Sequence, residues 1–265
     1  MGPRAGPPPG GRRHRYDRAE LLARATEEPE RHRQGHRSVL RGVRVTVLLV
    51  HGAGSTVDHN FRRPGWIDLL EASGRAVVGY DLPGHGDGIP PALPDGGAIV
   101  DDLLARLSGP VDAVGFSAGA QLLAGAASRD PARFSTLVLL GVGNGVLHPN
   151  PAGPLQLAAA IADEDDTNTT GRLFRRMARS AGNDIDGVRR YLQIPKPPVD
   201  PERLAKVDAP VLVVVGDRDF NAPADELAAA FPRGELTVVP GADHFGLASD
   251  VRCLDAVLSF LDRRG

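Results

Sequence analysis

Cysteine is nearly absent from the sequence. The 265 residues include a single cysteine, Cys253, which has no second thiol to pair with inside the chain. A disulfide framework is therefore excluded, and nothing in the sequence requires an oxidising compartment. Cys253 falls in an expected C-terminal helix, where a small buried apolar side chain is its typical role.

Long apolar runs are also missing. No stretch approaches the roughly 18 apolar residues that a helix needs to cross a bilayer. Residues 1–15 are rich in proline, glycine and arginine, and no apolar segment follows Arg12 and Arg13 as a signal peptide would require. We therefore expect a cytoplasmic protein in which residues 1–35 form a disordered segment with one peripheral helix, at residues 16–30.

The sequence has no large excess of charge of one sign. Its 31 Lys and Arg residues nearly balance 33 Asp and Glu residues, for a net charge of −2. This balance gives no basis for a nucleic-acid partner. The apolar fraction of 42% and the charged fraction of 24% are ordinary for a globular protein, and the length suits one α/β domain, expected at residues 36–265.

Apolar runs alternate regularly with amphipathic segments from residue 44 onward. Strands are expected at residues 44–50, 75–80, 111–116, 135–141, 211–215 and 235–239. Helices are expected at about residues 61–73, 98–107, 118–128, 223–231 and 248–263. This alternation indicates an α/β fold with a mostly parallel sheet covered by helices on both faces. It is interrupted at residues 142–205, where short helices are expected near residues 154–163, 169–181 and 184–193.

The most informative motif is Gly-Phe-Ser-Ala-Gly at residues 115–119, between an apolar strand and a helix. A serine on a tight strand-to-helix turn is held in strained backbone geometry, and glycines two positions away let the two elements approach closely. The first amides of the helix would point toward the serine oxygen, where the helix dipole favours negative charge. Ser117 is therefore a candidate nucleophile, and the Ala118 N–H is a candidate oxyanion donor.

A serine nucleophile needs a base and a carboxylate, and both follow later strands. The strand at 211–215 ends in a segment with Asp217 and Asp219, and the strand at 235–239 is followed by His244. The carboxyl ends of parallel strands share one edge of a sheet, so these side chains are expected to meet Ser117 there. Asp219 and Asp217 are both candidates for the acid at this point, and an acid elsewhere in the chain is a further alternative.

The order Ser117, Asp219, His244 resembles the catalytic triad of the α/β-hydrolase superfamily. Two further motifs carry the resemblance: His-Gly-Ala-Gly at residues 51–54 is similar to the family's oxyanion loop, and Asp-Leu-Pro-Gly-His-Gly at residues 81–86 is similar to its Asp-x-Pro-Gly-x-Gly turn. The resemblance implies that the Ala53 N–H is the second oxyanion donor. It also implies that residues 142–205 form a helical cap inserted after the family's sixth strand. The family's early antiparallel strands have only one weak candidate here, at residues 38–40.

Other polar residues have simpler interpretations. Asp217 and Asp243 are expected to brace their loops. The spacing of four residues, Asp58, His59, His51 and His85, does not suit a metal site, and structural roles are favoured for His51 and His85. An arginine cluster marks one cap helix, and we interpret it as a solvated basic face, with recognition of an anionic substrate as the alternative; its members are Arg172, Arg175, Arg176 and Arg179.

These features predict a serine hydrolase that cleaves a small carboxylic ester, lactone or thioester through an acyl-enzyme, without a cofactor or metal. By resemblance, a thioesterase acting on a CoA or acyl-carrier substrate, a cofactor-free perhydrolase, a C–C hydrolase and a hydroxynitrile lyase keep the same triad, so these alternatives stay open. A catalytically silent receptor for a small ligand is the alternative from another class. Haloalkane dehalogenases and epoxide hydrolases resemble the chain less, because they have aspartate where this chain has Ser117.

Overall fold

The structure is a computed structural model. It describes residues 45–88, 95–163, 168–196 and 199–263. The predictions for the first 35 residues, for a peripheral helix at 16–30 and for a strand at 38–40 fall outside the described residues.

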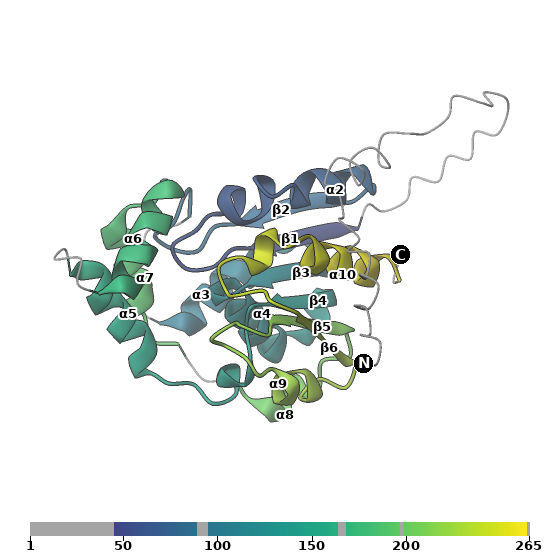
Figure 1. Cartoon of the computed structure of the whole chain (residues 1–265). Coiled ribbons are helices and arrows are strands. Elements are labelled where there is room, and N and C mark those ends of the chain that lie inside the picture. Colours follow the sequence, from purple (N-terminus) through teal and green to yellow (C-terminus); the bar gives the residue numbers. More distant parts are fainter. Residues whose placement is uncertain (1–44, 89–94, 164–167, 197–198, 264–265) are drawn as a thin grey trace, which may run out of the picture. The chain divides into compact units, whose positions relative to one another are not determined.

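A parallel sheet of six strands forms the centre of the described fold (Figure 1). The strands are β1 (Thr46–Val50), β2 (Ala76–Tyr80), β3 (Val111–Phe116), β4 (Phe134–Leu140), β5 (Val211–Gly216) and β6 (Gly234–Val239). Their order is β2-β1-β3-β4-β5-β6, and every neighbouring pair is parallel. The predicted α/β fold class is confirmed, and each strand lies within two residues of its predicted bounds.

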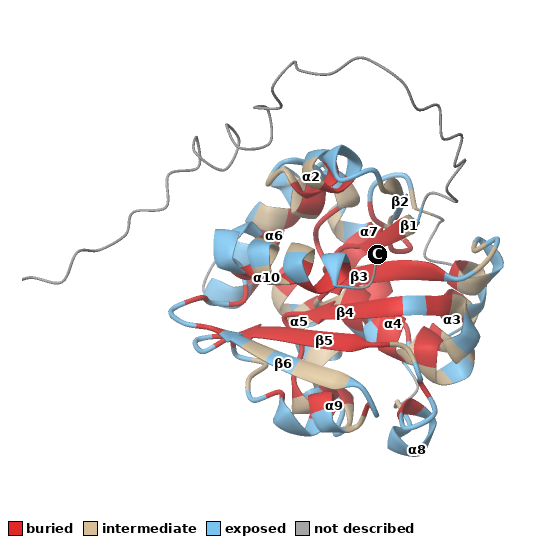
Figure 2. Cartoon of the chain, turned by 90° about the vertical axis from the view of Figure 1, so that its right-hand side faces the viewer, coloured by how far each residue is buried: buried red, intermediate tan, exposed pale blue. Residues whose placement is uncertain are grey.

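Helices cover both faces of this sheet, because side chains of successive strand residues point to opposite faces. On β1, Leu48 and Val50 pack in the cluster that includes α3 (Gly96–Ala105), α4 (Ala118–Arg129) and α9 (Asp225–Ala229). Val47 and Leu49 pack on the other side, against α2 (Trp66–Ala72) and α10 (Val251–Asp262). The central strands β3 and β5 are buried throughout (Figure 2).

Short helical turns connect several elements. They are η1 (Asp58–Arg62), η2 (Pro131–Arg133), η3 (Asn144–Val146), η4 (Leu247–Ser249) and the four-residue helix α8 (Pro201–Leu204). The single helix predicted at 61–73 is wrong: the chain forms the π-helical turn η1 and then α2, because Gly65 adopts a left-handed conformation with φ 94° between them.

The cap consists of α5 (Ala152–Ala162), α6 (Thr169–Ser180) and α7 (Ile185–Gln193), inserted between β4 and β5. These helices lie together at one end of the sheet (Figure 1, left). Side chains cap two of them: Asn168 accepts a hydrogen bond from Gly171 N–H at the start of α6, and Asp184 accepts one from Gly187 N–H at the start of α7. No helix in the described part of the chain is long and apolar enough to span a bilayer.

Candidate active site

Ser117 lies in strained backbone geometry at the junction of β3 and α4. Its φ of 52° and ψ of −114° make it the one non-glycine residue with a positive φ in the described ranges. The Ser117 N–H donates to the carbonyl of Leu140 on β4 at 2.8 Å, which holds the strained residue against the neighbouring strand. Such strain persists only where the surroundings over-determine it, and it presents the hydroxyl at the carboxyl edge of the sheet.

The two glycines of the motif are required by close backbone contacts. A Cβ at Gly119 would lie 2.2 Å from the carbonyl oxygen of Val50 and 2.6 Å from that of His51. A Cβ at Gly115 would lie 2.7 Å from the backbone nitrogen of Ala120. The first contact brings α4 against the end of β1, so the same glycine that tightens the turn also places the serine beside the loop that follows β1.

Three side chains from three strand ends form one hydrogen-bonded chain. The Ser117 Oγ lies 3.0 Å from Nε2 of His244, and Nδ1 of His244 lies 3.0 Å from both carboxylate oxygens of Asp219. His244 and Asp219 are each 5% exposed. With Nδ1–H donating to the carboxylate, Nε2 is the acceptor that faces the serine hydroxyl.

The two acids in the loop after β5, Asp217 and Asp219, have different hydrogen-bond partners. The Oδ1 of Asp217 accepts a hydrogen bond from Gly241 N–H at 2.6 Å, and the carboxylate that contacts His244 is that of Asp219. Asp219 is held instead by the backbone of Asn221, whose N–H donates to Oδ1 at 2.8 Å. Asn221, which the sequence did not single out, also donates its side-chain amide to the carbonyl of Gly141 at 2.9 Å. It therefore fixes the acid loop against the end of β4.

The loop after β1 is a tight turn over residues 52–55. Ser55 N–H donates to the Gly52 carbonyl at 3.1 Å, and Gly54 has φ 77°, as a type II turn requires at its third residue. The amides of the two glycines in this turn also have hydrogen-bond acceptors. Gly52 N–H donates to Asn60 Oδ1 and Gly54 N–H donates to His85 Nε2, both at 2.9 Å.

Two backbone amides near Ser117 take no part in these hydrogen bonds. Among the turn and loop hydrogen bonds of the described residues, neither Ala53 N–H nor Ala118 N–H is a donor. Ala118 is the first residue of α4, so its amide is one of those that a helix cannot pair internally. The two amides predicted as oxyanion donors therefore remain available to a bound oxygen.

His51 and His85 are neutral and hold backbone groups. Burial lowers the pKa of His51 to about 4 and the pKa of His85 to about 3. Nε2 of His51 accepts from Leu82 N–H at 3.0 Å, while Nδ1 contacts the Gly52 carbonyl at 2.7 Å. The 3.3 Å contact between His51 and Asp81 is therefore not an ion pair. In both rings the lone pair is occupied by an amide, which leaves no free ligand atom for a metal.

No cluster of three or more metal-binding side chains occurs within the described ranges. Asp58 is instead paired with Arg62 and Arg63 at 3.4 and 3.3 Å on the surface. His59 Nδ1 lies 3.2 Å from the Ser55 hydroxyl. Asp243 accepts a hydrogen bond from Gly246 N–H at 2.8 Å within its own loop.

The cap closes over the nucleophile. A cavity of about 20 Å³, room for about one water molecule, lies beside Ser117. One wall is polar and comes from the turn after β1, with Ser55 and Asn60. The other is apolar and includes two residues of α6, Phe174 and Met177. The remaining lining residues are Gly52, Ala53, Phe116, His244 and Phe245.

Aromatic side chains surround the His244 ring. Phe220, which is 66% exposed, lies on the imidazole with the ring centroids 4.3 Å apart, and Phe245 contacts it edge-on at 5.6 Å. Phe174 of the cap meets Phe245 at 5.6 Å. No sequence motif singles out Phe220 or Phe245, although each is the immediate neighbour of a predicted triad residue.

The arginine cluster of α6 is not a uniform solvated face, and that interpretation is wrong for Arg175. Arg175 is 5% exposed and donates to the carbonyls of Ala160, Ile161 and Asp163 at the end of α5. It thus caps the C-terminus of a neighbouring helix. Arg176 and Arg179 are exposed. Recognition of an anionic substrate or an acyl-carrier partner stays a prediction that could involve only the exposed arginines.

Comparison with known proteins agrees with this architecture. Residues 47–256 match the alpha/beta hydrolase family. No curated protein matches the sequence. Among solved structures, NosK from Streptomyces actuosus is 27% identical, with a TM-score of 0.59 over 83% of this chain and 99% of NosK.

Two more solved structures share the fold at lower identity. A thermophilic esterase from Thermogutta terrifontis is 22% identical, with a TM-score of 0.62 over 83% of this chain and 90% of the esterase. The 2-hydroxy-6-oxo-6-phenylhexa-2,4-dienoate hydrolase of Rhodococcus sp. strain RHA1 is 20% identical, with a TM-score of 0.58 over 83% of this chain and 90% of that enzyme. These structures show the shared fold, and the family model that matches residues 47–256 shows that this chain belongs to the alpha/beta hydrolase family.

Proposed function

We propose that the protein is a serine hydrolase that cleaves a small carboxylic ester, lactone or thioester through an acyl-enzyme. The observation that carries the proposal is the chain of 3.0 Å contacts from Ser117 through His244 to Asp219. A serine hydroxyl is a weak nucleophile by itself, and a histidine oriented by a carboxylate is the arrangement that activates it.

The geometry supports a two-stage reaction. As the Ser117 oxygen attacks the substrate carbonyl carbon, Nε2 of His244 takes the hydroxyl proton and Asp219 stabilises the imidazolium. The same proton then passes from Nε2 to the leaving group, which departs as the carbon–oxygen or carbon–sulfur bond breaks. Water, deprotonated by the same nitrogen, then attacks the acyl carbon, the bond from that carbon to the Ser117 oxygen breaks, and this oxygen takes the proton from Nε2 as the carboxylic acid is released.

The negative oxygen of each tetrahedral intermediate needs hydrogen-bond donors. The unpaired amides of Ala53, in the turn after β1, and of Ala118, the first residue of α4, are suited to this role. One such donor typically contributes a factor of about 10²–10³ to the rate, because it is aimed where charge develops.

The lining of the cavity favours a small apolar acyl group. Phe174, Met177 and Phe245 supply apolar surface, and the cavity of about 20 Å³ leaves little room without movement of the cap. The solved structures that share the fold include an esterase and a 2-hydroxy-6-oxo-6-phenylhexa-2,4-dienoate hydrolase, so the fold alone does not select one substrate. An ester of a short apolar acid is the substrate class that we propose first.

Replacement of Ser117 tests the proposal. We expect Ser117→Ala to lower kcat on a p-nitrophenyl short-chain ester by about 10⁵–10⁶-fold, as loss of a triad nucleophile does, and to abolish labelling by a fluorophosphonate probe. The matched control is Ser249→Ala, which removes an exposed serine elsewhere. Undiminished turnover by Ser117→Ala would refute the nucleophile, and a wild-type protein that neither turns over esters nor accepts the probe would indicate a silent receptor.

A further inference from the structure

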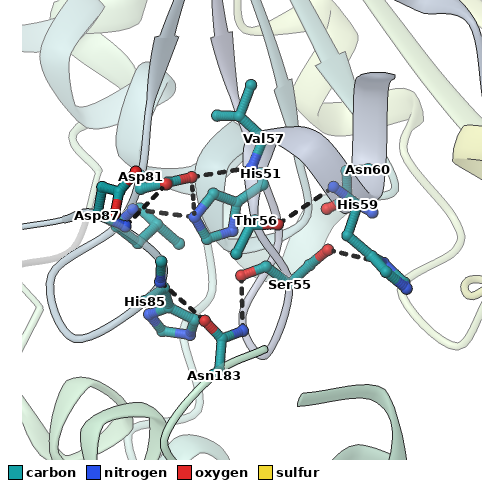
Figure 3. Close-up of polar contacts among 12 residues, drawn as sticks. His51, Ser55, Thr56, Val57, His59, Asn60, Asp81, His85, Asp87 and Asn183 are labelled. Atoms are coloured by element: carbon teal, nitrogen blue, oxygen red, sulfur yellow. Dashed lines mark hydrogen bonds and ion pairs between the residues drawn. The ribbon is translucent and has the colours of Figure 1, made fainter. Parts of the chain in front are cut away.

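One polar side chain of the cap reaches the loops on the substrate side of the sheet. Asn183, in the connection between α6 and α7, is 8% exposed. Its Nδ2 donates to the Ser55 carbonyl at 2.9 Å, and its Oδ1 accepts from Gly86 N–H at 2.8 Å. Figure 3 shows Asn183 beneath the turn after β1, between Ser55 and His85. Both halves of the amide are therefore used in joining loops that are far apart in the sequence.

These loops carry the groups that determine where the Ala53 amide points. Ser55 closes the turn in which Ala53 is the second residue. Gly86 follows His85, whose Nε2 holds the next amide of that turn, Gly54 N–H. Asn183 thus contacts Ser55, the last residue of the turn, directly. Through Gly86 it also holds the loop that carries His85, the acceptor of the Gly54 amide.

The position of Asn183 is itself fixed by close packing of the cap. A Cβ at Gly84 would lie 2.7 Å from the carbonyl oxygen of Gly187, and a Cβ at Gly187 would lie 2.5 Å from that of Gly84. On the next turn of α7, Tyr191 contacts the His85 ring edge-on at 5.2 Å. Because the backbones of Gly84 and Gly187 are in such close contact, the start of α7 has little freedom to move relative to the loop at Gly84. The position of Asn183, just before α7, is fixed in the same way.

We propose that Asn183 is a positioning residue, which holds the turn at residues 52–55 so that the Ala53 amide faces the oxygen bound at Ser117. This inference rests on the proposed serine hydrolysis. It makes the anchored end of the cap part of the oxyanion site, while the end that carries Phe174 and Met177 covers the pocket. A displaced turn would weaken an interaction that matters most in the tetrahedral state, so kcat should suffer more than KM.

The sharpest variant is Asn183→Asp. It keeps the size of the side chain and the acceptor for Gly86 N–H, but it replaces the donor to the Ser55 carbonyl by a second acceptor. We expect kcat on a short-chain p-nitrophenyl ester to fall by about 10–100-fold with KM within about twofold, as small misplacements of catalytic groups do. Affinity for phenylboronic acid, which forms a tetrahedral adduct with a serine oxygen, should fall by the same factor as kcat.

Protonation should partly rescue the same variant. A protonated carboxyl can again donate to the Ser55 carbonyl, and burial of the side chain favours the protonated form. The ratio of variant to wild-type kcat should therefore rise as the pH falls, whereas a ratio that is independent of pH would contradict donation to Ser55.

Thr136→Val is the matched control. Thr136 is 2% exposed and lies opposite Asp112, five residues before Ser117 on β3, so the variant changes a buried polar side chain away from the site. We expect it to lower the thermal midpoint but not kcat or boronate affinity. If Asn183→Asp leaves kcat unchanged while Ser117→Ala is inactive, the positioning role is wrong and the hydrolase proposal stands. If Thr136→Val loses as much kcat at equal stability, the effect of Asn183 is not specific.

Discussion

Two His–Asp pairs lie at the carboxyl edge of the sheet, one inside the candidate active site and one outside it, and they look alike at first sight. His244 lies 3.0 Å from Asp219, and His51 lies 3.3 Å from Asp81. Both histidines are buried, and both pairs follow the carboxyl ends of parallel strands. Only the first pair has a serine hydroxyl at its other ring nitrogen.

The difference lies in the backbone around each pair. An amide, Leu82 N–H, donates to the nitrogen of His51 that faces Asp81, so this ring is neutral and Asp81 instead accepts from Val57 N–H at 2.8 Å. In the other pair, Asp219 receives Nδ1 of His244 and leaves Nε2 open toward Ser117. A short His–Asp distance alone therefore does not identify a catalytic pair, because the partner of each ring nitrogen determines what it can do.

After loss of the Ser117 nucleophile, the largest effect is expected at one of the two aspartates and not at the other. Asp219→Asn should lower kcat by about 10⁴-fold, because an amide donating to Nδ1 leaves His244 in the tautomer that cannot accept the serine proton. Asp81→Asn should stay within about tenfold of wild type, since its acceptor for Val57 N–H is kept. Steady-state kinetics on one ester measures both.

Asp217→Asn is the control within the same loop as Asp219. Its Oδ1 can still accept from Gly241 N–H, so activity should remain near that of wild type. A loss at Asp217 as large as that at Asp219 would contradict the assignment of the acid.

A smaller effect tests the unpaired amide of the turn after β1. Ala53 is the second residue of a type II turn, where proline fits, so Ala53→Pro should delete its N–H without breaking the turn. We expect kcat to fall by about 10²–10³-fold with the thermal midpoint preserved. Ala53→Gly keeps the N–H and should retain most of the activity, so equal losses in the two variants would argue against hydrogen bonding by this amide.

The smallest effect concerns stability and the neutral histidines. The pKa values of His51 and His85, about 4 and about 3, lie below the 6.5 of an unperturbed histidine. Below pH 6.5 these two histidines bind protons in the unfolded chain but stay neutral in the folded protein, so the free energy of unfolding should fall on acidification. Each group contributes up to about 1.4 kcal/mol per pH unit, and the full stability is present above pH 6.5.

His85→Gln should reduce this dependence. Glutamine does not titrate, and its Oε1 can accept from Gly54 N–H, so the slope of unfolding free energy against pH should become shallower between pH 7 and 5. Urea denaturation at several pH values measures it. His148→Gln, which changes a side chain that is 70% exposed, should leave the slope unchanged, and an equal change in both variants would contradict the role of His85.

Much of this fold could be predicted because its signals are local. The apolar run at residues 211–216 is buried at every position, as expected for a central parallel strand. The two glycines of the motif around Ser117 indicate a tight turn, and the structure leaves no room there for a Cβ. Helix boundaries were less predictable at residues 61–73, where the left-handed Gly65 divides the segment.

The contacts of the cap side chains could not be predicted from local sequence patterns. Arg175 looked like one of several surface arginines, but it is buried against the end of α5 because α6 packs beside that helix. Asn183 carried no motif, and its two partners lie 97 and 128 residues away. A periodic pattern reports which face of a helix is apolar, but it carries no information about which distant carbonyl a polar side chain meets.

The sequence by itself determined the parallel sheet, the helical insertion and the three strand ends from which Ser117, Asp219 and His244 come, because parallel strands deliver their carboxyl ends to one edge. Only the tertiary structure decided which amides stay unpaired beside Ser117, which His–Asp pair is open to a hydroxyl, and how the cap supports the turn after β1. Those properties depend on hydrogen bonds between loops far apart in the chain, and only the folded chain brings the loops together.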